Sequence, residues 1–177
     1  MKKNLFVILI LLPLLTSCAA LSELTKIPTS ISQNITIPMI PVAGGSLIPI
    51  TTPDIKVNVD SILSAAGMSK DLIQTVKLST MDFTLTSPTG TGKDLSFLSN
   101  VTVALVYSGT PTTIASTTSA VSAGTTVLPF TVQDVDLKPY FSTFKLKVSG
   151  NTTKATTADY FVTIHMKFIV DLNILGL

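Results

Sequence analysis

The sequence lacks several residue types that carry recognition or catalytic chemistry. Arginine is absent, so all 12 basic residues are lysine, and no forked guanidinium is available to bind a carboxylate or phosphate through paired hydrogen bonds. The chain has 1 cysteine and 1 histidine. A single thiol excludes an internal disulfide and a thiolate-rich metal site, and a single imidazole would have to share any metal with aspartates.

An excess of charge of one sign is also missing from most of the chain. The formal net charge is +2, from 12 basic and 10 acidic residues. Lys2 and Lys3 account for that excess, because 12 minus 2 leaves 10 lysines against the 10 acids. No basic stripe remains, which argues against nucleic-acid binding, and no polybasic segment is present to bind an anionic membrane surface.

A short apolar run follows a basic N-terminus. Met1-Lys2-Lys3-Asn4 carries positive charge, and residues 5–15 are apolar throughout. A helix that crosses a bilayer needs about 20 apolar residues. The run is too short for that, and its length and basic flank are typical of a secretory signal peptide.

Four residues at the end of this run predict how the chain is processed after export. Leu15-Thr16-Ser17-Cys18 resembles the lipobox of bacterial lipoprotein precursors, in which an aliphatic and two small residues precede a cysteine. The resemblance covers the first 18 residues. It implies cleavage before Cys18, a diacylglyceryl group on the Cys18 thiol and acylation of the new amino terminus. The alternatives are an ordinary secretory signal with an incidental cysteine and an uncleaved membrane anchor.

A lipid on Cys18 would hold the mature chain on a membrane, because each buried methylene contributes about 0.8 kcal/mol. Ala19 follows Cys18. In Gram-negative bacteria an aspartate at that position resembles an inner-membrane retention signal, so its absence favours the outer membrane. Glu23 is the one acid just beyond, which favours the periplasmic face over the cell surface. The expected location is the cell envelope.

The chain divides into three parts on these patterns. Residues 1–17 are the expected signal peptide, residues 18–33 a lipidated polar tether, and residues 34–177 a single domain. The domain is rich in Thr, Val and Ile, which favour strands. Seven or more short alternating segments predict an all-β fold, an antiparallel β-sandwich of immunoglobulin-like or related type with one or two short helices.

Several segments of the domain carry specific expectations. Residues 28–53 contain several prolines and are interpreted as short edge strands, with an extended tether as the alternative. Residues 54–60 alternate as a half-buried strand. Asp60 is expected to cap a helix over residues 61–66, and Ser69 a second helical turn.

The second half of the domain has clearer alternation. The apolar phase slips near Ser79 and Thr80, which predicts a β-bulge. Residues 126–132 predict one short strand. Residues 144–148 and 160–170 alternate strongly, and together they predict a C-terminal hairpin.

A glycine-rich segment superficially resembles a phosphate-binding loop. It reads Gly90-Thr91-Gly92-Lys93-Asp94, but the full motif requires glycine where Ser87 stands and Ser or Thr where Asp94 stands. Pro88 and the flanking strands favour a hairpin turn instead.

Few other residues are candidates for chemistry. By alternation His165 faces away from the core, and a hydrolase would need a serine and an aspartate beside it. Four aspartates are candidates for a carboxylate pair or a calcium site, although helix capping explains them as well: Asp54, Asp60, Asp134 and Asp136. Asp134 and Asp136 are expected to share one strand face.

These observations predict a membrane-anchored lipoprotein that acts as a non-enzymatic structural or binding module. Its membrane contact is the lipid on Cys18, and its expected partner is another envelope protein or a glycan, without nucleic acid. No catalytic residue, metal or cofactor is predicted. The alternative function is binding of a lipid or another apolar ligand, which the 46% hydrophobic composition favours.

Overall fold

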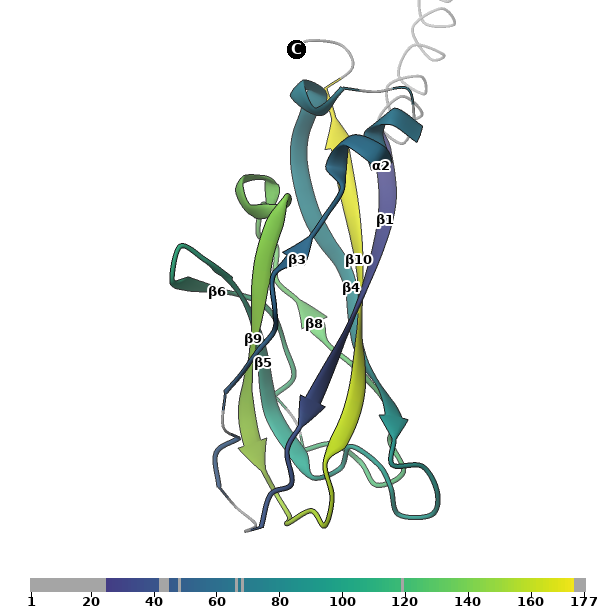
Figure 1. Ribbon diagram of the computed structural model, residues 1–177, viewed down its shortest axis with the longest axis vertical. Coiled ribbons are helices and arrows are strands. Elements are labelled where there is room, and N and C mark those ends of the chain that lie inside the picture. Colours follow the sequence, from purple (N-terminus) through teal and green to yellow (C-terminus); the bar gives the residue numbers. More distant parts are fainter. Residues whose placement is uncertain are drawn as a thin grey trace, which may run out of the picture.

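The computed structural model describes residues 25–41, 45–47, 49–65, 67, 69–118 and 120–173, and these form two antiparallel sheets packed face to face (Figure 1). The predicted all-β sandwich is therefore confirmed. In chain order the elements are β1 (Lys26–Ile37), β2 (Ile50–Thr51), β3 (Ile55–Lys56), α2 (Val59–Ala65), the 3-10 turn η1 (Lys70–Leu72), β4 (Ile73–Ser87), β5 (Leu98–Tyr107), β6 (Thr110–Ser116), β7 (Val127–Pro129), β8 (Thr131–Val132), the 3-10 turn η2 (Lys138–Tyr140), β9 (Thr143–Thr152) and β10 (Tyr160–Leu172).

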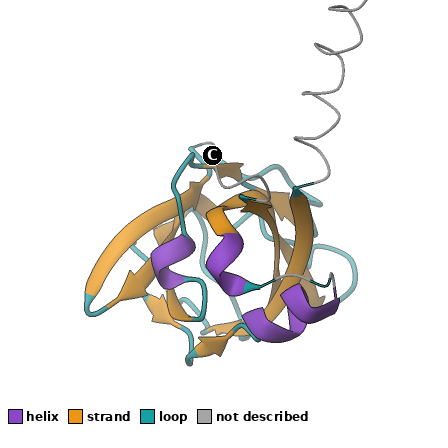
Figure 2. Cartoon of the chain, turned by 90° about the horizontal axis from the view of Figure 1, so that it is seen from above, coloured by secondary structure: helices purple, strands orange, loops and turns teal. Residues whose placement is uncertain are grey.

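The two sheets are unequal in size. Sheet I has 4 strands in the order β1-β10-β4-β7. Sheet II has 6 strands, in the order β2-β9-β5-β6-β8 with β3 also beside β9. The helical turns lie across one end of the molecule, where the view from above shows them over the opening between the sheets (Figure 2).

The core lies between the sheets and follows from strand alternation. Every second residue of β10 from Tyr160 to Leu172 is buried, and Leu105 and Leu146 are buried in sheet II. Aromatic rings join the two layers, because the Phe168 ring of sheet I lies 6.4 Å from the Phe144 ring of sheet II. Full burial of a large apolar side chain contributes about 1.5–3 kcal/mol.

The predicted C-terminal hairpin is wrong. β9 pairs with β5 in sheet II, whereas β10 pairs with β1 and β4 in sheet I. The connection through residues 153–159 is thus a corner that changes sheets. Both strands bury one face in the same core from opposite sides, so their alternation is the same as that of a hairpin.

The boundary between tether and domain also differs from the expectation. Residues 26–33 belong to β1, which pairs along its whole length with β10. Ile27 and Ile31 face inward and are half-buried, while Ile35 and Ile37 are buried. β1 is the edge strand of sheet I and tolerates Pro28. The polar residues between these isoleucines face outward, which is why the segment resembles a tether.

The region before β4 shows a third difference. The strand predicted over residues 54–60 ends at Lys56, and α2 begins at Val59. Asn58, not Asp60, provides the cap, because its Oδ1 accepts a hydrogen bond of 2.9 Å from the Ser61 backbone N–H. The Ser69 cap is confirmed, since its hydroxyl accepts from the Asp71 backbone N–H.

The bulge predicted in β4 is confirmed. Lys167 pairs with Thr80 and Phe168 with Leu78, so Ser79 is the extra residue. The strand predicted over residues 126–132 is instead split. β7 joins sheet I and β8 joins sheet II, and Phe130 lies between them. The Phe130 ring packs 4.6 Å from Phe83 in the core.

Candidate functional site

Cys18 lies outside the described residues, so its lipidation stays a prediction. The described chain starts beside the end of β10, where the Thr25 hydroxyl donates to Asp171 at 2.7 Å and Leu172 N–H donates to the Thr25 carbonyl at 3.1 Å. Seven residue steps from Cys18 to Thr25 span at most about 25 Å. We call this end of the sandwich, with the start of β1, the end of β10 and η1, the anchor end (Figure 1).

A buried carboxylate ties the loops together at the opposite end. One oxygen of Asp94 accepts from the Ser96 backbone N–H at 2.9 Å and from the Ser96 hydroxyl, and the other accepts from Gly124 N–H at 2.8 Å. Lys154 Nζ lies 3.6 Å from Asp94 and donates to Ser96 Oγ at 2.6 Å. Asp94 therefore joins three loops, those after β4, β6 and β9.

These contacts set the electrostatics of that end. The Ser96 hydroxyl and the Gly124 N–H stabilise the ionised carboxylate and lower the pKa of Asp94 from 3.8 to about 2. Burial, together with the charge of Asp94, raises the pKa of Tyr160. The glycine-rich segment is thus a turn whose last residue, Asp94, holds neighbouring loops together, an arrangement we call the loop staple. The carboxylate of Asp94 stands where the phosphate-loop motif requires a hydroxyl. Sequence reasoning did not identify this role of Asp94; the signal that could have shown it is an aspartate followed two residues later by a serine, which is typical of an Asx turn.

His165 lies on the outer face of sheet I, as the alternation predicts. Its exposed ring has Ser32 Oγ 3.0 Å from Nδ1, and Asp82 is its register partner on β4. Asp82 Oδ1 accepts instead from the Thr84 hydroxyl at 3.0 Å. A serine and an aspartate do flank His165. Within the described residues, however, the aspartate makes no hydrogen bond or ion pair with the ring, and a triad requires the carboxylate to orient the imidazole.

The four candidate aspartates do not converge. Asp54 lies 3.6 Å from Lys145, and Asp134 lies 2.6 Å from Lys77. The hydrogen bond to Asp134 raises the pKa of Lys77.

Asp136 accepts from Val76 N–H at 2.9 Å and from Lys138 N–H at 3.0 Å, so it joins β4 to η2. Asp134 and Asp136 lie in a loop rather than on one strand face, and Asp60 is exposed in the first turn of α2. Among the described residues no group of three or more His, Cys, Asp or Glu side chains that could hold a metal is found.

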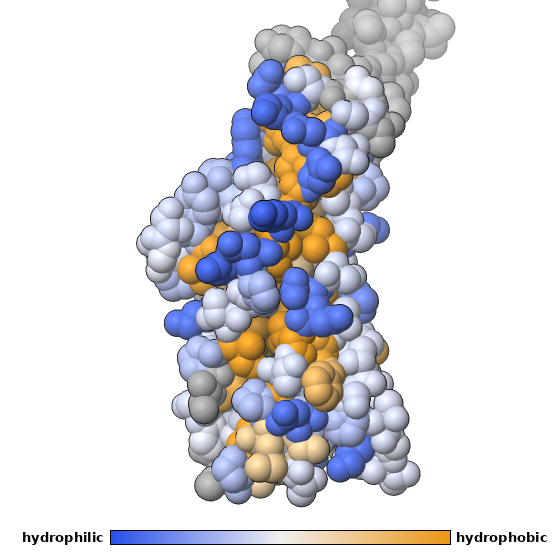
Figure 3. All heavy atoms as spheres, viewed as in Figure 1, coloured by the Kyte–Doolittle hydropathy of each residue, from blue (hydrophilic) through white to orange (hydrophobic). Residues whose placement is uncertain are grey.

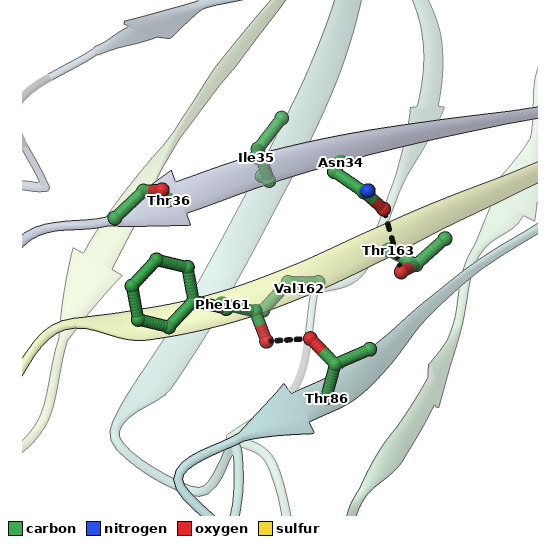
Figure 4. A pocket seen from close by; sticks show the side chains of 7 residues that line it. All are labelled: Asn34, Ile35, Thr36, Thr86, Phe161, Val162 and Thr163. Carbon is green, nitrogen blue, oxygen red and sulfur yellow. Dashed lines mark hydrogen bonds between the residues drawn. The ribbon is translucent and has the colours of Figure 1, made fainter.

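The outer face of sheet I carries an open groove around an exposed aromatic ring (Figure 4). Its volume is about 390 Å³, and it is lined by Asn34, Ile35, Thr36, Thr86, Phe161, Val162 and Thr163. We call it the Phe161 groove. The Phe161 side chain is 48% exposed although it stands mid-sheet between β1 and β4. Sequence reasoning placed Phe161 on the outer face of its strand but did not single it out.

Hydrogen bonds fix the polar side chains of this groove. Thr163 donates its hydroxyl to Asn34 Oδ1 at 2.8 Å, and Thr86 donates its hydroxyl to the Phe161 carbonyl at 2.8 Å (Figure 4). The Asn34 amide NH₂ has no partner among the described residues, and neither has the Thr36 hydroxyl. Both groups are thus available to a ligand.

A different surface follows the edges of the two sheets. Figure 3 shows an apolar strip on this side, flanked by hydrophilic side chains. Edge elements contribute partly buried side chains that pack against the core: Ile27, Ile31, Ile50, Val57 and Val59. In the described part of the chain, no helix has the length and apolar character to cross a bilayer.

Comparisons with known proteins do not place the chain in a family. No protein-family model matches it, and no curated protein does. Among solved structures it is similar to infectious bursal disease virus strain Gx, with 12% identity over 82% of this chain and a TM-score of 0.44. This chain spans 32% of that one.

Turnip yellow mosaic virus at 14% identity and Desmodium yellow mottle tymovirus at 15% identity are also similar. Each match covers 82% of this chain, together with 94% and 82% of the viral chains, at TM-scores of 0.27 and 0.20. The assignment of the fold therefore depends on this chain's own strand pairing.

Proposed function

We propose that this chain is a lipid-anchored, non-enzymatic binding module of the bacterial cell envelope, held on the outer membrane through Cys18. The observation that carries the proposal is the distance between the start of the described chain and the Phe161 groove. The chain enters the sandwich beside Asp171, and Phe161 lies ten residues away along the same strand. At 3.3 Å per residue this separation is about 33 Å. A lipid near Thr25 would leave the groove at the far end of β10 from the membrane, on the side of the sandwich.

The described chemistry supports binding rather than catalysis. The one histidine lies on an open sheet face, and its neighbouring aspartate bonds to Thr84 rather than to the ring. The one buried aspartate, Asp94, is occupied by loop hydrogen bonds. The hydrogen bonds to Asp94 lower its pKa to about 2 and keep it ionised, so it is not suited to exchange a proton near neutral pH.

The anchor is tested by changing its one cysteine. Cys18→Ala is expected to abolish incorporation of radioactive palmitate and to leave an unprocessed precursor, because no other thiol is present. Ser17→Ala is the matched control, since it keeps a small residue in the lipobox and should preserve both labelling and processing. Normal cleavage and release of the Cys18→Ala protein would show that the anchor is not a lipid.

The outer-membrane location is tested at the next residue. Ala19→Asp is expected to move the labelled protein from the outer-membrane to the inner-membrane fraction of a sucrose gradient, with Ala19→Ser as the control. If both variants fractionate with the wild type in the inner membrane, the proposed location is wrong while the anchor stands.

Binding of an apolar ligand is a second candidate function, favoured by the apolar strip along the sheet edges (Figure 3). Its test is mass spectrometry of organic extracts from purified protein whose own lipid has been removed. A copurified lipid in stoichiometric amount would support it. An extract without such a lipid would end it, because a carrier retains its cargo through purification.

A further inference from the structure

We propose that the Phe161 groove binds a neutral glycan chain. This inference rests on the proposed binding function and names the class of ligand. It follows from the ring, from the polar groups around it, and from the pairing of the strands beneath it.

The ring of Phe161 is a flat apolar surface offered to solvent. It is 48% exposed on the outer face of β10, and its direct neighbour on β1 is Thr36 rather than another apolar residue. A pyranose ring presents an apolar face of C–H groups, which carry slight positive charge. The face of an aromatic ring is slightly negative and attracts such groups, as it attracts the positive edge of another ring.

The polar side chains beside the ring match the rest of a sugar. Asn34 and Thr36 point from β1 toward the groove with hydrogen-bonding groups that lack partners among the described residues, and Thr163 lies across from Asn34 (Figure 4). Amides and hydroxyls both donate and accept, as sugar hydroxyls do. None of the seven lining residues is charged. An ionic ligand would therefore find no counter-charge in the groove, whereas a neutral one needs none.

The backbone beneath the groove disfavours an extended peptide as the occupant. A peptide strand is bound by adding to a free sheet edge. Phe161 and Val162 lie on β10, which pairs with β1 on one side and β4 on the other, so the strand that carries the ring has no free edge. The free edge of sheet I is the far side of β1, away from the ring. A ligand at this place has to be held through side chains, which is how a stacked glycan is held.

The polar face continues beyond the groove. A second groove of about 250 Å³ lies farther along β10 and is lined by Ser30, Ile31, Ser32, Thr80, His165, Met166 and Lys167. From Phe161 to Lys167 the strand extends about 20 Å. Lys167 adds one cation at the far end of this surface. The length fits an oligosaccharide rather than a single sugar, with the ring of Phe161 as the stacking end.

The test is calorimetric titration of the mature lipidated protein in detergent micelles. The probes are the tetrasaccharides of β-linked N-acetylglucosamine, β-linked glucose and α-linked glucose. At least one is expected to bind, and Phe161→Ala is expected to weaken that binding at least tenfold. Phe161→Tyr should retain most of it, because the ring remains.

The matched control is Tyr107→Ala, since Tyr107 is also 48% exposed but belongs to sheet II. It should leave the affinity unchanged. A melting curve for each variant shows that the fold survives. Absence of binding by all three sugars, or equal binding by Phe161→Ala and wild type, would overturn the proposal. Palmitate labelling and a protein partner recovered from solubilised envelope would in that case leave the anchored binding module standing without a glycan ligand.

Discussion

Replacing Asp94 by asparagine tests whether one carboxylate holds the loop end together. The substitution keeps the shape of the side chain but removes its charge, and it replaces one acceptor by an NH₂ group that faces a donor. The wild-type carboxylate is 6% exposed and accepts from Ser96 and Gly124. Hydrogen bonds to a charged group contribute about 1.5–3 kcal/mol. The lowering of its pKa from 3.8 to about 2 corresponds to about 2 kcal/mol.

The sign of the pH dependence follows from that pKa. The folded state holds the Asp94 proton more weakly than the unfolded state, so ionisation stabilises the fold. The contribution is fully present above about pH 5 and is lost as the pH falls toward 2, the folded pKa of Asp94. The asparagine variant lacks this contribution at every pH. The difference in unfolding free energy between wild type and Asp94→Asn should thus be about 2 kcal/mol at pH 7 and shrink on acidification.

Urea unfolding followed by circular dichroism at several pH values measures this difference. At neutral pH the melting temperature should fall by about 4–8 °C. Asp159→Asn is the matched control, because Asp159 is an exposed aspartate at the same end with one hydrogen bond of 2.8 Å, from Met39 N–H. It should cost less than about 1 kcal/mol. Two results would refute the role given to Asp94. One is a loss of unfolding free energy below 1 kcal/mol for Asp94→Asn; the other is a difference between wild type and variant that does not shrink between pH 5 and pH 2.

Other substitutions test packing and surface electrostatics. Gly150→Ala should destabilise the fold by about 1–3 kcal/mol in urea unfolding, because a Cβ would lie 3.2 Å from Val101 Cα and 3.3 Å from the Ser99 carbonyl. A neutral result would mean that the backbone of β5 shifts to accommodate the methyl group. Phe83→Ala should cost about 3–5 kcal/mol, since the ring is fully buried, and a loss under 1 kcal/mol would contradict the packing described. Asp134→Asn should change stability by less than about 1 kcal/mol despite its 2.6 Å contact with Lys77, because the Asp134 side chain is 81% exposed; a larger loss would show that the pair is more than a surface contact.

Local patterns predicted the elements of this fold better than their pairing. The bulge at Ser79 appeared as a slip in apolar phase, and the Ser69 cap as a polar residue before a helical turn. Both signals are confined to a few adjacent residues. The split of residues 126–132 between two sheets has no such signal, because Leu128 and Phe130 both turn toward one shared core. Strand partners are set by contacts far apart in the sequence, which alternation does not record.

The candidate sites show the same difference between local signals and long-range contacts. Alternation placed His165 outside the core. Asp136 precedes the cap residue of η2, and its carboxylate accepts from one backbone N–H of η2 and one of β4, which the capping interpretation did not predict. Asp94 was considered only as a mismatch to a phosphate loop. Its contact with Gly124 crosses 30 residues of sequence, so the burial that makes it a staple is a property of the assembled loops. The Phe161 groove likewise needs β1, β4 and β10 side by side.

The loop staple and the groove are linked through the start of β10. Tyr160 is buried, and its ring packs 4.6 Å from Phe97, in the loop that Asp94 holds. Because side chains alternate along a strand, a buried Tyr160 forces Phe161 to the outer face. Loosening the Asp94 loop would therefore release the residue that fixes the orientation of the exposed ring. The anchor end contacts the other terminus of β10 through Asp171 and Leu172. One strand thus sets both where the described chain enters the sandwich and which face of sheet I carries the proposed binding surface.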